Sequence, residues 1–179
     1  MSAEQKYKLE IKLFCTQIRN LRKEFGITQN QLKALTGITQ SQISLLEKAE
    51  SNPNPGFETL VKLASGLKVS MAALFAYNPK NIVPTFRKKY PSIEKRTIAE
   101  KKYFGKRVEE LCSHRKLKQD ELAILARIDA ADLSRYINGE TNIEFFSIIK
   151  IAEALEVRMF DLFDYKGPLP DNKGFSGKL

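Results

Sequence analysis

The sequence predicts an all-α protein built from two similar units in tandem. Apolar residues recur at three- and four-residue spacing, which is typical of helices with one buried face. Capping residues and glycines mark where several of these helices begin and end. A shift of 90 residues places like residues on one another, including Phe14 on Phe104 and Leu32 on Leu122. A repeat of this length indicates two copies of one structural unit.

The first unit is expected to begin with a helix over residues 3–25, which ends at Gly26 because glycine adopts positive φ at little cost. The buried stripe of this helix contains Leu9, Leu13, Phe14, Ile18 and Leu21. After the loop SNPNPG, two further helices are expected over residues 58–68 and 71–75. Their core residues are Leu60, Leu63, Ala64, Leu67, Leu74 and Phe75.

Between these elements, residues 27–49 contain two short helical patterns separated by Gly37. Thr28 is a good N-cap for the first helix, with Gln31 placed for a capping box, and Thr39 caps the second. The second helix turns Ile43 and Leu46 inward and leaves Gln40, Ser41, Gln42 and Leu45 outward. A first turn that exposes small amides and hydroxyls suits contact with base-pair edges in a DNA major groove.

The motif TQxxL, the glycine turn and TQSxISxxEK, followed by PGFETLVKLASGLKVSMAALF, resembles the phage-repressor/Cro family, also called the XRE family. The resemblance covers residues 12–77. It implies lambda-repressor-like helix-turn-helix domains of five helices, whose reading helix enters the major groove of double-stranded DNA. It also implies a structural ion pair between Arg22 and Glu47.

The resemblance further implies which side chains contact DNA. The expected base-reading residues are Gln40, Ser41, Gln42 and Leu45. The expected phosphate-binding residues are Thr28, Gln29, Thr39, Ser44 and Lys48. Gln29 could instead serve only to start its helix, and Lys48 could simply be solvated. Weaker DNA contacts are expected in the second unit from Lys118, Gln119, Arg135 and Asn138, with Arg135 alternatively a surface cation or a partner of Asp132.

The repeat defines the expected domain boundaries. The first helix-turn-helix domain spans residues 1–77, the second spans 93–165, and a basic, proline-containing linker spans 78–92. Ser92 is expected to cap the helix that opens the second domain. A glycine- and proline-rich tail over residues 166–179 is expected to be flexible.

Charge separates the two units. Residues 11–77 carry a net charge of +4 and residues 78–103 carry +6, whereas residues 104–165 carry −3. Because phosphate neutralisation supplies much of the affinity for DNA, we expect the first unit and the linker to dominate binding. Cys112 and Ile137 replace the pair Arg22 and Glu47, and the joint change to apolar side chains indicates that the second unit is still folded.

Several classes of function have little support in the sequence. Cys15 and Cys112 lack metal-ligand spacing, and His114 is the only histidine, so we expect no metal, no cofactor and no catalytic site. The chain has no apolar run of signal-peptide or membrane-spanning type, so a cytoplasmic protein without a membrane partner is expected. The family resemblance implies a bacterial or phage origin.

These observations predict a sequence-specific, double-stranded DNA-binding transcriptional regulator. The net charge of +9 favours a polyanionic partner. Because the two reading helices differ, we expect a homodimer of chains in which the first units read DNA, rather than an intramolecular pseudo-dimer. Two alternatives remain open at this point. The chain could be an antitoxin that represses its own operon and binds a protein partner through the acidic second unit, or a protein-interaction adaptor.

Overall fold

The computed structural model describes residues 3–77, 90–173 and 175–176, and within them every regular element is a helix. The predicted all-α class is therefore confirmed. The first unit contains α1 (Ala3–Glu24), α2 (Gln29–Thr36), α3 (Gln40–Leu46), the 3-10 turn η1 (Ala49–Ser51), α4 (Phe57–Gly66) and the 3-10 turn η2 (Ala72–Phe75). The second unit contains α5 (Ile93–Arg115), α6 (Gln119–Ala126), α7 (Ala130–Ile137), α8 (Phe145–Ala154) and α9 (Met159–Phe163).

The local signals for helix ends are confirmed. Thr28 caps α2 in a capping box, and Gly37 ends that helix with φ of 71°. Ser92 caps α5 by accepting a hydrogen bond from the backbone N–H of Lys95 at 3.3 Å. The last predicted helix of the first unit is a 3-10 turn, whereas its counterpart α9 in the second unit is α-helical.

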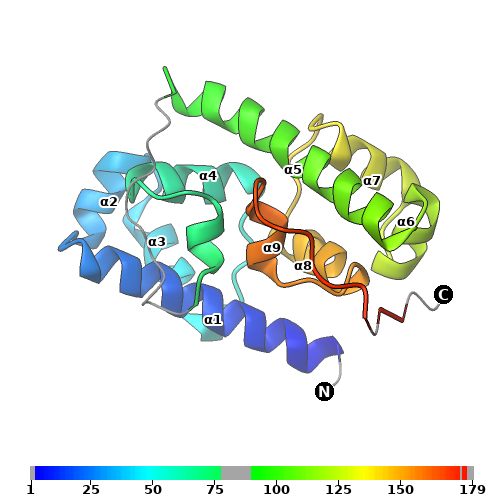
Figure 1. Cartoon of the computed structure of the whole chain (residues 1–179). Coiled ribbons are helices and arrows are strands. Elements are labelled where there is room, and N and C mark those ends of the chain that lie inside the picture. The colour runs from blue at the N-terminus through cyan, green and yellow to red at the C-terminus, as the bar shows by residue number, and fades with distance from the viewer. Residues whose placement is uncertain (1–2, 78–89, 174, 177–179) are drawn as a thin grey trace.

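The two units share one hydrophobic core. Buried side chains of both halves form a single cluster. Figure 1 shows α1 and α5 along opposite edges of the molecule, with α4, α8 and α9 between them and the α2–α3 and α6–α7 pairs at opposite ends. The halves are therefore not separate globules joined by a linker.

The loops that precede α4 and α8 pair with each other reciprocally. The N–H of Phe57 donates to the carbonyl of Ile143 at 2.8 Å, and the N–H of Phe145 donates to the carbonyl of Pro55 at 3.0 Å. The second unit is two residues shorter in this loop, so from here on the repeat shift is 88 residues, and Pro55 and Phe57 are equivalent to Ile143 and Phe145. The two hydrogen bonds are therefore two copies of one contact. Such reciprocity is the mark of a two-fold, isologous interface.

Two equivalent asparagines extend the same pattern. Asn142 accepts a hydrogen bond from the N–H of Glu58 at 3.0 Å, and Asn54 accepts one from the N–H of Phe146 at 2.9 Å. Each asparagine therefore satisfies a backbone donor at the start of the other unit's helix, where intrahelical partners are missing.

Aromatic rings fill the space around this pseudo-two-fold axis. The equivalent rings of Phe75 and Phe163 stack on each other with centroids 4.6 Å apart. Phe14 contacts Phe145 at 4.7 Å, and the equivalent pair of Phe57 and Phe104 lies at 5.5 Å. Aromatic pairs at these separations add stabilisation beyond the area they bury.

The described part of the C-terminal tail, residues 166–173 and 175–176, contacts α5, and the expected flexibility of the tail stays a prediction. Arg107 donates to the carbonyl of Pro168 at 3.1 Å, and Arg115 donates to the carbonyl of Asp171 at 3.0 Å. Arg115 also lies over the ring of Phe175 at 4.5 Å. These arginines of α5 are buried, and the tail carbonyls are among the acceptors that they require. Of the predicted linker, residues 78–89 lie outside the described part of the chain.

Truncation of Phe57 or Phe145 tests the shared core. Phe57→Ala and Phe145→Ala should each lower the free energy of unfolding by about 3–5 kcal/mol, because each removes a fully buried ring. Each variant should still unfold in one transition, measured by far-UV circular dichroism and tyrosine fluorescence during denaturant titration. Phe146→Ala, at a half-buried neighbour, is the control and should cost less. Two separate transitions would contradict a shared core.

Candidate nucleic-acid interface

Helix α3 presents one polar, exposed face and one buried face. Ile43 and Leu46 are 0% and 6% exposed and anchor the helix in the core. Gln40, Ser41 and Gln42 are exposed on the first turn, and Leu45 is 52% exposed one turn later. The predicted base-reading residues therefore share the outer face of a short, anchored helix.

The first turn of α3 is held by a capping box that the sequence analysis missed. The hydroxyl of Thr39 accepts a hydrogen bond from the N–H of Gln42 at 3.2 Å, and the side-chain oxygen of Gln42 accepts one from the N–H of Thr39 at 3.1 Å. The spacing TQSQ carries this signal, since glutamine at the third helical position is typical of the motif. Gln42 keeps its amide NH₂ group for outward contacts.

Glu47 ties α1, α2 and α3 together. Arg22 donates to the two carboxylate oxygens of Glu47 at 2.5 and 2.8 Å, in the bidentate geometry of arginine–carboxylate pairs. Gln29, at the start of α2, donates to the same carboxylate at 3.0 Å. The expected contact between Arg22 and Glu47 is present, and the structure adds Gln29 to it.

The surroundings of Glu47 keep its carboxyl group charged. Burial alone raises its pKa, but hydrogen bonds from Arg22 and Gln29 and the nearby positive charges of Arg22 and Arg19 outweigh burial. The pKa of Glu47 therefore lies below its ordinary value of 4.5. A lowered pKa in the folded chain means that the pair stabilises the fold above that ordinary value, and that this stabilisation is lost as the pH falls through the lowered pKa.

The other predicted phosphate-binding residues of the first unit lie near the ends of α2 and α3. Thr28 and Thr39 are the N-caps of α2 and α3, and both are exposed. Ser44 is half-buried on α3, and Lys48 is exposed directly after that helix. Gln29 is half-buried and held by Glu47, so it extends from a fixed position at the start of α2.

The equivalent helix α7 presents a different surface. Asp129 caps it by accepting hydrogen bonds from the N–H groups of Ala131 and Asp132 at 2.9 and 3.2 Å. Arg135 is exposed and donates to the carboxylate of Asp132. The alternative role for Arg135, as the partner of Asp132, is therefore realised in this structure. Lys118, Gln119 and Asn138 are exposed around the same unit.

Comparison with known proteins identifies both units. Residues 18–74 match a helix-turn-helix family, and residues 107–168 match the Cro/C1-type HTH DNA-binding domain. An uncharacterized HTH-type transcriptional regulator of Sinorhizobium fredii is 38% identical over 63 residues, which cover 35% of this chain and 79% of that protein. The chain belongs to the HTH-type transcriptional regulators. The resemblance predicted from the motifs is confirmed.

Two further similarities are shorter. An uncharacterized HTH-type transcriptional regulator of Haemophilus influenzae is 44% identical over 46 residues, or 26% of this chain. The matched part spans 45% of that protein, which is less than half its length. A crystal structure of an HTH_3 family transcriptional regulator from Vibrio cholerae is 31% identical, covers 41% of this chain and 40% of its own, and has a TM-score of 0.37.

Membership of this regulator family implies DNA binding. Burial raises the pKa of the Cys15 and Cys112 thiols to about 11, so neither is a thiolate at neutral pH. The described residues contain no group of histidine, cysteine and carboxylate side chains that could hold a metal ion. In the same residues no helix is both long enough and apolar enough to cross a bilayer.

The second unit of this HTH regulator has no counterpart of the ion pair between Arg22 and Glu47. The equivalent positions hold apolar side chains that pack in the core. Cys112 and Ile137 are each 7% exposed. Helix α5 approaches α7 so closely that a Cβ atom on Gly105 would lie 1.7 Å from the carbonyl oxygen of Ile137. The expected folded second unit is confirmed, and only glycine fits at this contact.

The ion pair can be tested by a double-mutant cycle. Glu47→Ala should lower the free energy of unfolding by about 3–5 kcal/mol, because it leaves the guanidinium of Arg22 without its bidentate partner. Arg22→Cys combined with Glu47→Ile copies the second unit and should recover most of that loss. Denaturant unfolding of the parent, Arg22→Cys, Glu47→Ile and the double variant measures the coupling. Additive effects would contradict the pairing.

Proposed function

We propose that this chain is a transcriptional regulator that binds specific double-stranded DNA with α3 as its principal reading helix. The observation that carries the proposal is the exposed first turn of α3, which is fixed by its capping box and anchored by Ile43 and Leu46. The base-reading residues would be Gln40, Ser41, Gln42 and Leu45. Amide groups can hydrogen-bond adenine edges, hydroxyls can contact any base, and leucine can contact a thymine methyl group.

Phosphate contacts would set the position of α3 on the duplex. Thr28 and Gln29 lie at the start of α2, where backbone N–H groups and the helix dipole favour an anion. Thr39, Ser44 and Lys48 would contact the backbone beside the reading helix. The link from Gln29 to Glu47 supports this arrangement, because it joins the phosphate-binding end of α2 to the end of α3.

The reciprocal packing supports an intramolecular pseudo-dimer on DNA. Family members of this type present two reading helices about 34–36 Å apart on successive major-groove faces. In this chain α7 would be the second reader, with Arg135 available for guanine once it leaves Asp132. Since α7 offers Ala130 and Ala131 where α3 offers Gln40 and Ser41, its half-site would be read less specifically.

The homodimer of chains expected from the sequence stays a prediction. That prediction rested on the unlike reading helices and on the net negative charge of the second unit. In the structure, the second unit of the same chain packs on the first through the rings of Phe14, Phe75, Phe145 and Phe163. We therefore favour one chain per operator.

Substitution of the reading helix tests base recognition. Gln40→Ala with Ser41→Ala should reduce discrimination between the selected operator and single-base variants, with each lost contact worth about 1–3 kcal/mol. Operators would first be selected from a random duplex pool, and affinities measured by fluorescence anisotropy. Lys48→Ala is the control, and it should weaken binding to all sequences and lower the salt slope by about 1. Unchanged discrimination in the double variant would exclude α3 as the reader.

The stoichiometry on DNA tests the pseudo-dimer. Light scattering of the complex should give one chain per duplex, and hydroxyl-radical footprinting should show two protected regions about one helical turn apart. The half-sites should differ in sequence, and Arg135→Ala should affect only the weaker one. Two chains on a palindromic site would instead support the homodimer.

A further inference from the structure

A pocket of about 760 Å³ lies between the N-terminal half of α1, the end of η2 and helices α8 and α9. Its walls therefore come from both units. Most of the lining is apolar and includes Leu9, Leu13, Phe75, Met159 and Phe160. Small-molecule sites commonly combine such an apolar lining with a few polar groups.

The polar groups of this pocket include two neighbouring carboxylates, Glu10 and Glu153. Tyr77 donates a hydrogen bond to Glu10. One carboxylate oxygen of Glu153 is buried and accepts no hydrogen bond from any described residue. Burial, together with the negative charge of Glu153, raises the pKa of Glu10 although the bond from Tyr77 opposes this. A buried acceptor without a donor is costly, and a cation placed here would remove that cost.

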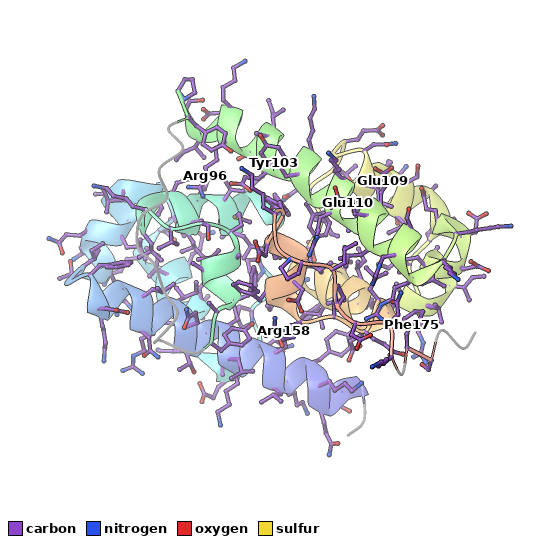
Figure 2. All side chains as sticks on the ribbon, in the orientation of Figure 1. Arg96, Tyr103, Glu109, Glu110, Arg158 and Phe175 are labelled. Atoms are coloured by element: carbon purple, nitrogen blue, oxygen red, sulfur yellow. The ribbon has the colours of Figure 1, made fainter. Side chains whose placement is uncertain are left out.

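The repeat contains a second copy of this location, and there a guanidinium group fills it. Arg96 of α5 is 5% exposed. Its guanidinium donates to Glu100 at 3.3 Å, to the hydroxyl of Ser65 at 3.0 Å and to the carbonyl of Val69 at 2.9 Å. In Figure 2 the labelled Arg96 lies where the start of α5 meets the first unit, and the labelled Arg158 lies between α9 and α1, beside the pocket.

The partners of Arg96 have direct counterparts in the pocket. Glu100 corresponds to Glu10, Ser65 to Glu153 and Val69 to Val157, and all three counterparts line the pocket. The position of Arg96 itself is taken by Lys6, which also lines the pocket but is exposed. Both locations thus have a glutamate on the first helix of a unit, α1 or α5, and a valine shortly after α4 or α8. The pocket has the carboxylate of Glu153 at the position where the site around Arg96 has the hydroxyl of Ser65.

We propose that the pocket binds a small organic cation with a guanidinium head and an apolar stem. The head would sit at Glu10 and Glu153, as the guanidinium of Arg96 sits at Glu100 and Ser65. The stem would lie on Leu13 and Phe75. Planar guanidinium groups suit paired oxygen acceptors better than a lysine ammonium does. The inference is independent of the proposed DNA binding, because the ligand is tested on the full chain without DNA.

The direct test is titration of the full chain with n-butylguanidinium, followed by NMR chemical shifts. Saturable shifts should occur at residues on both sides of the pocket, in α1 and in α8, with a Kd below about 10 mM. N-butylurea has the same shape without the charge and should bind at least about tenfold more weakly. Equal binding of the neutral compound, or no saturable shift with the cation, would overturn the proposal.

Variants separate the pocket from surface electrostatics. Glu153→Gln should weaken n-butylguanidinium binding at least about tenfold, whereas Glu140→Gln removes an exposed carboxylate outside the pocket and should leave it unchanged. Lys6→Arg places a guanidinium at the position equivalent to Arg96, so it should compete with the probe and raise the melting temperature. Thermal unfolding of each variant reports folding. Equal loss in Glu140→Gln, or full binding in folded Glu153→Gln, would refute recognition by this pocket.

Discussion

The reciprocal hydrogen bonds between the loops before α4 and α8 hold both units in one body. Phe57 and Phe145 each donate to the other loop, and each ring then enters the shared core. Because backbone groups make these bonds, the pairing depends little on side-chain identity and tolerates divergence elsewhere. The pseudo-two-fold arrangement of helices, and the pocket beside it, both depend on this contact.

The two units are stabilised by different interactions at equivalent positions. The first unit keeps a buried, charged network in which Glu47 joins three helices. The second unit replaces it with apolar side chains and with the close approach of α5 to α7 at Gly105. A buried charge requires all its partners at once, so the charged network ties the orientation of α3 to α1 and α2. The apolar contact imposes no such bond on α7.

Much of each unit could be predicted because its signals are local. The caps Thr28 and Thr39 and the stop at Gly37 depend on residues a few positions away. The contacts between units could not be predicted, because the hydrogen-bond partners of Asn142 and Asn54 lie 84 and 92 residues away along the chain. A sequence repeat also does not indicate whether its two copies pair within one chain or between two chains. In the candidate nucleic-acid interface, the exposure of Gln40, Ser41 and Gln42 could be predicted from helical spacing. The capping role of Gln42 and the bond from Gln29 to Glu47 could not be separated from DNA contact, because an amide suits both.

The long sequence separation of these contacts also affects how the chain reaches its folded state. Closing loops of 84 to 92 residues carries a large entropic cost, so the contacts between units form late. At about 5–20 residues per second, synthesis leaves the first unit waiting on the order of 5–20 seconds for its counterpart. Meanwhile the rings of Phe14, Phe57 and Phe75 lack their contacts with Phe145, Phe104 and Phe163 of the second unit. The nascent first unit therefore has an apolar surface that chaperones or a second nascent chain can bind, and exchange of units between chains is the expected error of assembly.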